Sequence, residues 1–72
     1  MIRPIHRLDV VALTTDLPKR GLVRGQVGTV VEVLDREVYE IEFPDDRGRT
    51  YAQLPLRTDQ LLVLHYVPQP AA

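Results

Sequence analysis

Apolar residues recur along this chain in short runs with a period of two, and turn-forming residues separate the runs. No window carries the i, i+3, i+4, i+7 apolar pattern over three turns that an amphipathic helix would show. The runs therefore predict β-strands, and the Gly, Pro and Asp residues between them predict turns. The expected strands cover residues 8–14, 27–34, 37–43, 49–56 and 61–66.

The third run, EVYEIEF, has the clearest alternation in the chain. Tyr39, Ile41 and Phe43 share one face of the expected strand, and Glu40 and Glu42 stand on the other. Successive side chains of a strand point to opposite faces, so we expect one face in the core and the other in water. We interpret the two glutamates as solvated charges that discourage edge-to-edge pairing.

The fourth run contains a proline. Pro55 cannot donate a hydrogen bond to a neighbouring strand, so we expect the strand to end there or to lie at a sheet edge. Residues 56–60, which follow, predict a single 3₁₀ or helical turn with Thr58 as its cap.

The connections predict the architecture. A tight polar turn at residues 34–37 and the turn PDDRG at residues 44–48 join three strands into an antiparallel meander over residues 27–56. Five strands, a long first loop and a one-turn 3₁₀ helix before the last strand predict an all-β, SH3-like small barrel. An OB-fold also has five strands, but the five-residue connection between strands three and four leaves no room for its helix.

Length and composition limit the domain count and the available stabilising groups. A chain of 72 residues forms one domain at most. We expect an N-terminal extension over residues 1–7, the barrel over residues 8–66 and a flexible tail over residues 67–72. The chain has no cysteine and two histidines, so no disulfide can form and no cofactor or metal is expected. Tight β packing and self-association, as a homo-oligomer, remain as sources of extra stability.

The same composition indicates a location. The N-terminal segment MIRPIHRLDVV lacks the long apolar run of a signal peptide. No uncharged run approaches the roughly 18 residues of a membrane span. We therefore expect a soluble, cytoplasmic protein with no membrane partner.

A series of short motifs resembles a known bacterial family. The motifs are DVVALTTDLP, then GLxxGxVGTVVEV, YEIEF, GRTYA and DQL, and they extend roughly over residues 8–64. This series resembles the family of short proteins designated domain of unknown function 4926. The resemblance implies an SH3-like barrel and no assigned biochemical activity.

Two more distant resemblances concern the first loop and the strand after it. The pattern LPxxxLVRGxxGTV is similar to the SH3-like domain of the nitrile hydratase β subunit, which packs against a separate metal-bearing subunit. The metal-binding cysteine cluster belongs to that other subunit and has no counterpart in this chain. The segment GQVGTV also resembles KOW-type barrels of ribosomal and transcription proteins.

The glycines of this stretch do not form a phosphate-binding loop. Gly21, Gly25 and Gly28 are spaced G-x₃-G-x₂-G and lead from a loop into a strand, whereas the dinucleotide fingerprint G-x-G-x-x-G leads from a strand into a helix. We expect Gly21 and Gly25 to adopt positive φ, and Gly28 to mark a bulge or a close approach of backbone.

The net charge of −1 conceals an uneven distribution. Residues 1–24 carry five basic and two acidic side chains, a balance of +3, and residues 32–46 carry seven acidic and one basic, a balance of −6. Basic loop residues could contact nucleic acid, but nucleic-acid-binding domains are typically strongly basic and rich in exposed aromatic residues. Of the four aromatic residues, Tyr39 and Phe43 are assigned to the core, which leaves Tyr51 and Tyr66.

Catalytic groups are few. Serine and cysteine, the usual acyl-transfer nucleophiles, are absent, and no threonine lies beside a histidine in the sequence. His6 and His65 lie near opposite termini and would come close only if the first and last strands are neighbours. We interpret them as ordinary surface residues and expect no enzymatic activity.

These observations favour a non-catalytic protein-interaction module, for example an accessory or regulatory subunit, whose partner protein the sequence does not identify. The first loop carries the candidate partner-binding residues Leu17, Lys19, Arg20, Leu22, Val23 and Arg24. Its three apolar members could form an anchor within a charged rim, or could equally complete a small core under the loop. Two alternatives remain open: a KOW-like nucleic-acid-binding module, and an antitoxin-like or immunity-like inhibitor of one partner protein.

Overall fold

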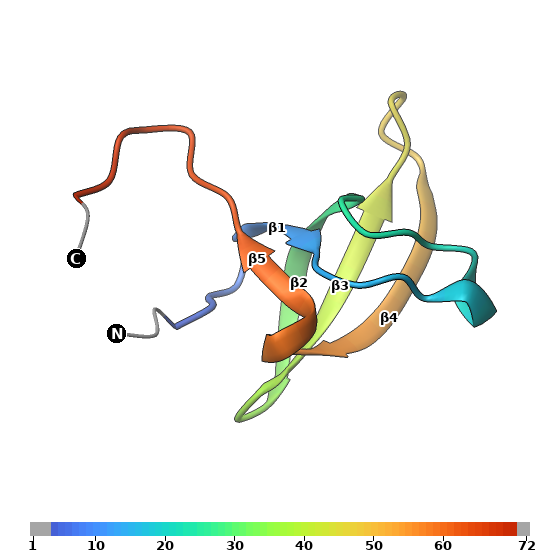
Figure 1. Cartoon of the computed structure of the whole chain (residues 1–72), viewed down its shortest axis with the longest axis horizontal. Helices are drawn as coiled ribbons and strands as arrows, with labels where there is room; N and C mark the ends of the chain where they lie inside the picture. Colours follow the sequence, from blue (N-terminus) through green and yellow to red (C-terminus); the bar gives the residue numbers. More distant parts are fainter. Residues whose placement is uncertain (1–3, 71–72) are drawn as a thin grey trace.

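The computed structural model describes residues 4–70 of the chain. This part of the chain forms five β-strands and two short 3₁₀ helices, η1 and η2, and contains no α-helix (Figure 1). In chain order the elements are β1 (Val10–Leu13), η1 (Pro18–Arg20), β2 (Val27–Asp35), β3 (Val38–Pro44), β4 (Thr50–Arg57), η2 (Thr58–Gln60) and β5 (Leu61–Val63). The all-β class, the five strands and the 3₁₀ turn before the last strand are confirmed.

All five strands belong to one antiparallel sheet in the order β4-β3-β2-β1-β5. The expected meander is present, because β2 pairs with β3 and β3 pairs with β4. The long strand β2 pairs with β1 through residues 27–29 and with β3 through residues 29–35. In Figure 1 the short strands β1 and β5 lie across the direction of β3. No pairing among residues 4–70 joins β4 to β5, so the sheet is open and the closed barrel is not confirmed.

The core lies on the inner side of this bent sheet. Tyr39, Ile41 and Phe43 of β3 are all buried, as the alternation predicts. Glu40 and Glu42 lie on the other face but are half-buried and not fully in water, because β3 lies between β2 and β4 and is not an edge strand. The other buried members come from the remaining four strands and from the N-terminal and first-loop segments: Ile5, Val11, Leu13, Leu22, Val30, Leu54, Leu56 and Leu61. Burying such side chains supplies most of the stabilisation of a domain this small.

At Gly28, β2 lies against β3 with no room for a side chain. A Cβ atom built there would be 2.8 Å from the carbonyl oxygen of Glu42 and 2.8 Å from Cγ2 of Ile41. The close backbone approach expected at this glycine is therefore confirmed. The irregularities of β2 lie further along, between Val30 and Glu32 and between Val33 and Asp35.

The end of β4 corrects one expectation. β4 is an edge strand, as Pro55 predicts, and the strand runs through the proline to Arg57 because an edge strand tolerates a missing donor. Thr58 is not the cap of η2, because it is the first residue of that turn and Arg57 holds the cap position. The N–H of Arg57 donates to Oε1 of Gln60 at 2.9 Å, and the hydroxyl of Thr58 donates to the carbonyl of Glu37 at 3.5 Å.

β5 is shorter than the expected residues 61–66. Its partner β1 begins at Val10, and the N–H of Leu64 already donates to the carbonyl of Val10 at 2.9 Å. Beyond that bond β1 offers no further residue to pair with, since Leu8 has a φ of 74° and breaks the extended backbone. The length of β5 is thus set by how far its partner β1 extends and not by the length of its own apolar run.

Candidate functional site

The first loop, residues 17–24, is a folded unit held by its own backbone. Leu17 and Leu22 form an isolated antiparallel bridge, in which the N–H of Leu17 donates to the carbonyl of Leu22 at 2.8 Å and the reverse bond is 3.2 Å long. Between them Pro18 opens η1, where its fixed φ suits the first helical position. Gly21 closes η1 with a φ of 68°, a conformation that glycine adopts without steric cost.

Side chains from outside this segment hold its C-terminal half. Oδ1 of Asp16 accepts the N–H of Arg24 at 2.8 Å, and Oε1 of Gln26 accepts the N–H of Val23 at 2.6 Å. The amide nitrogen of Gln26 donates to the hydroxyl oxygen of Tyr51 on β4 at 3.0 Å. Sequence reasoning missed Asp16, Gln26 and Tyr51. The only available signal was the tendency of an Asp beside a turn to accept backbone N–H groups.

The three apolar candidates of the first loop differ in exposure. Leu22 is 2% exposed and belongs to the core, and Leu17 is partly buried against it. Val23 is 57% exposed. The structure therefore assigns Leu22 and Leu17 to the small core under the loop, which was one of the two interpretations, and it leaves Val23 as the apolar group that the loop presents to solvent.

The basic candidates of the first loop lie at the surface. Lys19, Arg20 and Arg24 are exposed, and none of them forms an ion pair with a carboxylate in the described part of the chain. In Figure 1, η1 projects from one side of the sheet, away from both chain ends. The first loop thus carries three uncompensated positive charges and one exposed valine on an ordered backbone.

The acidic residues concentrate on β2, β3 and the turn after β3. Glu32 and Glu40 are cross-strand partners, and Glu40 accepts a hydrogen bond from the amide of Gln53 at 3.2 Å. In the turn, Oδ1 of Asp45 accepts the backbone N–H groups of Arg49 and Arg47 at 2.9 and 2.8 Å. The pKa of Asp45 lies below its ordinary value of 3.8, chiefly because of the hydrogen bond from the backbone N–H of Arg49. The backbone N–H of Arg47 and the side chain of Arg49 also lower it.

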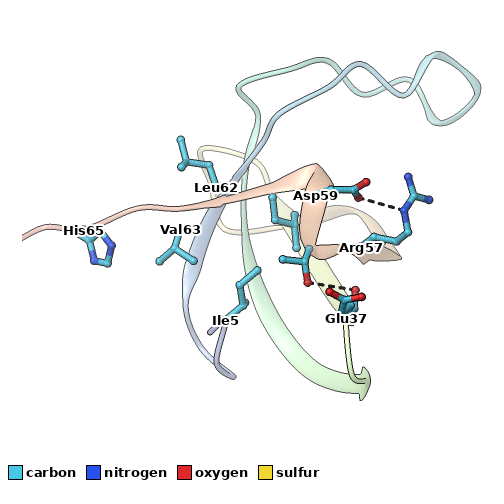
Figure 2. A pocket seen from close by; sticks show the side chains of 9 residues that line it. Ile5, Glu37, Arg57, Asp59, Leu62, Val63 and His65 are labelled. Carbon is cyan, nitrogen blue, oxygen red and sulfur yellow. Dashed lines mark hydrogen bonds and ion pairs between the residues drawn. The ribbon is translucent and has the colours of Figure 1, made fainter. Parts of the chain in front are cut away.

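A groove of about 610 Å³ runs beside β5 (Figure 2). Its apolar lining includes Ile5, Leu61 and Val63. Figure 2 shows charged side chains at one end, where Nε of Arg57 lies 3.2 Å from Oδ1 of Asp59, and His65 at the other. The sequence offered no sign of this groove, because its walls come from three segments that are distant in the chain: Ile5, Glu37 and residues 57–65.

A smaller hollow beside the groove brings the two histidines together. His6, Asp9 and His65 all line it, as expected if the first and last strands are neighbours. The backbone N–H of His6 donates to Oδ2 of Asp9 at 2.8 Å, and both histidines are exposed. Within residues 4–70, no three His, Cys, Asp or Glu side chains are arranged to hold a metal ion. The same part of the chain contains no helix long and apolar enough to cross a membrane.

Comparison with known proteins adds the family. No curated protein and no solved structure is significantly similar to the chain. The model of the family described as a domain of unknown function, DUF4926, matches residues 7–63. This match spans every strand of the sheet and the first loop, and it agrees with the motif series of the sequence. The chain therefore belongs to the DUF4926 family.

Proposed function

We propose that this chain is a small non-catalytic protein-binding module that binds an acidic surface of a partner protein through its first loop. The observation that carries the proposal is the set of three exposed cations, Lys19, Arg20 and Arg24, without a carboxylate partner in the described structure. The loop that presents them is ordered before any partner arrives, and a preorganised loop loses less conformational entropy on binding.

The exposed Val23 supports a protein partner. Interfaces combine a desolvated apolar centre with a polar rim, and Val23 lies between the basic residues Arg20 and Arg24 in the sequence. Complementary charge around such a contact mainly raises the association rate and selects the partner. An accessory subunit and an inhibitor of one partner protein would use this surface in the same way.

For the fold, we propose an SH3-like small barrel that is incompletely closed. The support is the order of elements: a long first loop, the β2–β4 meander, a 3₁₀ turn, and a last strand paired with the first. Fold does not determine the ligand, so this assignment adds no argument about the partner.

The test is affinity capture from cells of the source organism with three tagged proteins: wild type, K19E/R20E and the control R36E/R47E. The control makes the same change of charge at two exposed arginines in other turns. We expect one protein to be retained by wild type and control, and its retention to fall at least tenfold with K19E/R20E. Equal retention by all three proteins, or no specific retention by wild type, would refute the proposal.

Nucleic-acid binding is the alternative outcome, and it has its own assay. Phosphate contacts strengthen as salt falls, so a nucleic-acid module would shift DNA or RNA in a gel at about 50 mM salt. We expect no shift, because the net charge is −1 and acidic residues line β2 and β3. A shift that K19E/R20E abolishes would replace the protein partner by a nucleic acid.

A further inference from the structure

The outer edge of β5 has unpaired backbone groups. The bonds from Leu64 N–H to Val10 and from Thr14 N–H to the carbonyl of Gln60 show that even-numbered residues of β5 bond to β1. In an antiparallel ladder the residues between them turn their N–H and C=O groups to the other side. The C=O of Leu61 and both backbone groups of Val63 therefore face away from β1, where the described residues offer no strand to pair with.

Exposed leucines flank these free groups. Leu62 is 57% and Leu64 is 36% exposed, and both lie on the outer face of the sheet. Leu62 stands opposite Ala12, which in turn stands opposite Val27, another exposed apolar residue. An apolar row thus runs across three strands and stops at the free edge of β5.

The groove beside this edge has two different ends. Glu37 and Asp59 provide carboxylates at one end, and Arg57 pairs with Asp59, so Glu37 is left without an ion-pair partner in the described structure. His65, an exposed imidazole that always carries an N–H donor, lies at the other end (Figure 2). If the groove of a second molecule runs beside this one in the opposite direction, the His65 donor of each molecule lies at the carboxylate end of the other.

We propose that the free edge of β5 pairs antiparallel with β5 of a second copy of this chain, about a two-fold axis at Val63. In this register Val63 faces Val63 of the second copy through the unpaired N–H and C=O groups. Leu62 then faces Leu64 of the second copy, and the same contact repeats on the other side of the axis. The two sheets become one sheet of ten strands, and the isologous interface closes without forming a fibre.

Hydrogen-bonding groups and apolar surface both favour a second copy as the occupant. The two-fold axis brings His65 of one copy to the groove end that holds Glu37 and Asp59 of the other. The apolar row through Ala12 and Leu62 continues into Leu64 of the second copy. A stable interface buries about 800 Å² on each partner, and Tyr66 and Val67, which are exposed beyond β5, supply further apolar area along the opposing groove.

A cysteine pair tests the register directly, because the chain has no native cysteine. Residues in a non-hydrogen-bonded antiparallel pair have Cα atoms about 4.5 Å apart, within the range of a disulfide. We expect an equimolar mixture of L62C and L64C to form disulfide-linked dimers at least tenfold faster than either variant alone. Equal rates in the mixture and in the single variants would overturn the proposed pairing.

Solution mass tests the dimer independently of disulfide chemistry. Light scattering coupled to gel filtration should give about twice the chain mass of 8.2 kDa for wild type and for V33R, and the single-chain mass for L64R. Val33 is an exposed control at the far end of β2, 47% accessible against 36% for Leu64. A wild-type mass of one chain at about 1 mM, or dissociation of V33R together with L64R, would overturn the proposal. If L64R does not fold, as circular dichroism would show, the cysteine mixture decides.

The proposed β5 interface lies on the opposite side of the molecule from η1 (Figure 1). The dimer and the partner-binding role of the first loop can therefore fail independently of each other.

Discussion

Leu17 and Leu22 bond to each other through both of their backbone N–H groups, and this bridge makes the neighbouring side chains of Leu22 and Val23 point in opposite directions. It turns Leu22 inward, where it is 2% exposed, and leaves Val23 at the surface. The first loop is rich in basic residues and glycine, a composition typical of flexible segments. The bridge nevertheless makes it a small folded element attached to the core.

Replacing Leu22 should cost much more stability than replacing Val23. L22A removes a fully buried side chain and leaves a cavity, which should lower the free energy of unfolding by about 2–5 kcal/mol. V23A removes exposed atoms and should change it by no more than about 0.5 kcal/mol. Urea denaturation of the two variants measures the difference. Similar losses in both would show that Val23 also packs in the core.

Gln26 should control the order of the first loop, because its side chain joins Val23 to Tyr51. Q26A removes both hydrogen bonds and should cost about 1 kcal/mol, and the amide hydrogen of Val23 should exchange faster with solvent. The matched variant Y51F removes only the bond from Gln26 to β4 and should leave the Val23 amide protected. Exchange rates measured by NMR distinguish the two; equal exchange in both variants would contradict the assignment.

Gly28 and Gly48 should both resist replacement by alanine, for different reasons. In G28A the new Cβ would meet the backbone of β3, so we expect a loss of about 1–3 kcal/mol from overpacking. Gly48 has open space around it but a φ of 81°, so G48A should lose about 1 kcal/mol through backbone strain alone. NMR shifts should change along β3 in G28A and only within the turn in G48A. Shifts confined to β2 in G28A would show that no contact with β3 is strained.

Asp45 should contribute to the acid sensitivity of the fold. The folded state holds its pKa below 3.8, so in acid the unfolded state binds more protons than the folded state. The stabilisation is therefore complete above about pH 5, begins to fall as the pH approaches the unfolded-state pKa of 3.8, and is lost as the pH falls through the lower, folded-state pKa. Because Asp45 is partly exposed, solvent screening keeps the effect small.

Urea midpoints from pH 5 to pH 2 test this sign. The midpoint of D45N should fall less steeply with acid than that of wild type, because an amide cannot lose a charge on acidification. D46N is the control, since the side chain of Asp46 makes no hydrogen bond within the described structure and its replacement should leave the wild-type slope unchanged. A D45N slope equal to that of wild type would contradict the prediction.

Local pattern was sufficient for most of the secondary structure. The alternation of Tyr39, Ile41 and Phe43 with glutamates predicts both β3 and the face that it buries, because side-chain direction in a strand depends only on position along it. Pro55 likewise predicts an edge strand, because a missing N–H is tolerated only where no neighbour needs it. The positive φ angles of Gly21 and Gly25 follow from turn chemistry alone.

Features that depend on a distant partner were not available from the sequence. The alternation of β2 fails after Val30 because two irregularities shift its register against β3, and this leaves Val33 and Leu34 exposed. The length of β5 depends on where β1 begins, and the open gap between β4 and β5 depends on how far the whole sheet bends. The position of Thr58 in η2 follows from how far β4 continues past Pro55.

The sequence by itself determined the five strands, their turns, the buried face of β3 and the basic composition of the first loop, because each depends on residues adjacent in the chain. Only the tertiary structure decided that Leu22 points inward and Val23 outward, since the two are alike in polarity and differ only in what lies beneath them. It alone also revealed the groove and the free edge at β5, because a surface built from segments far apart in the chain exists only once those segments are packed together.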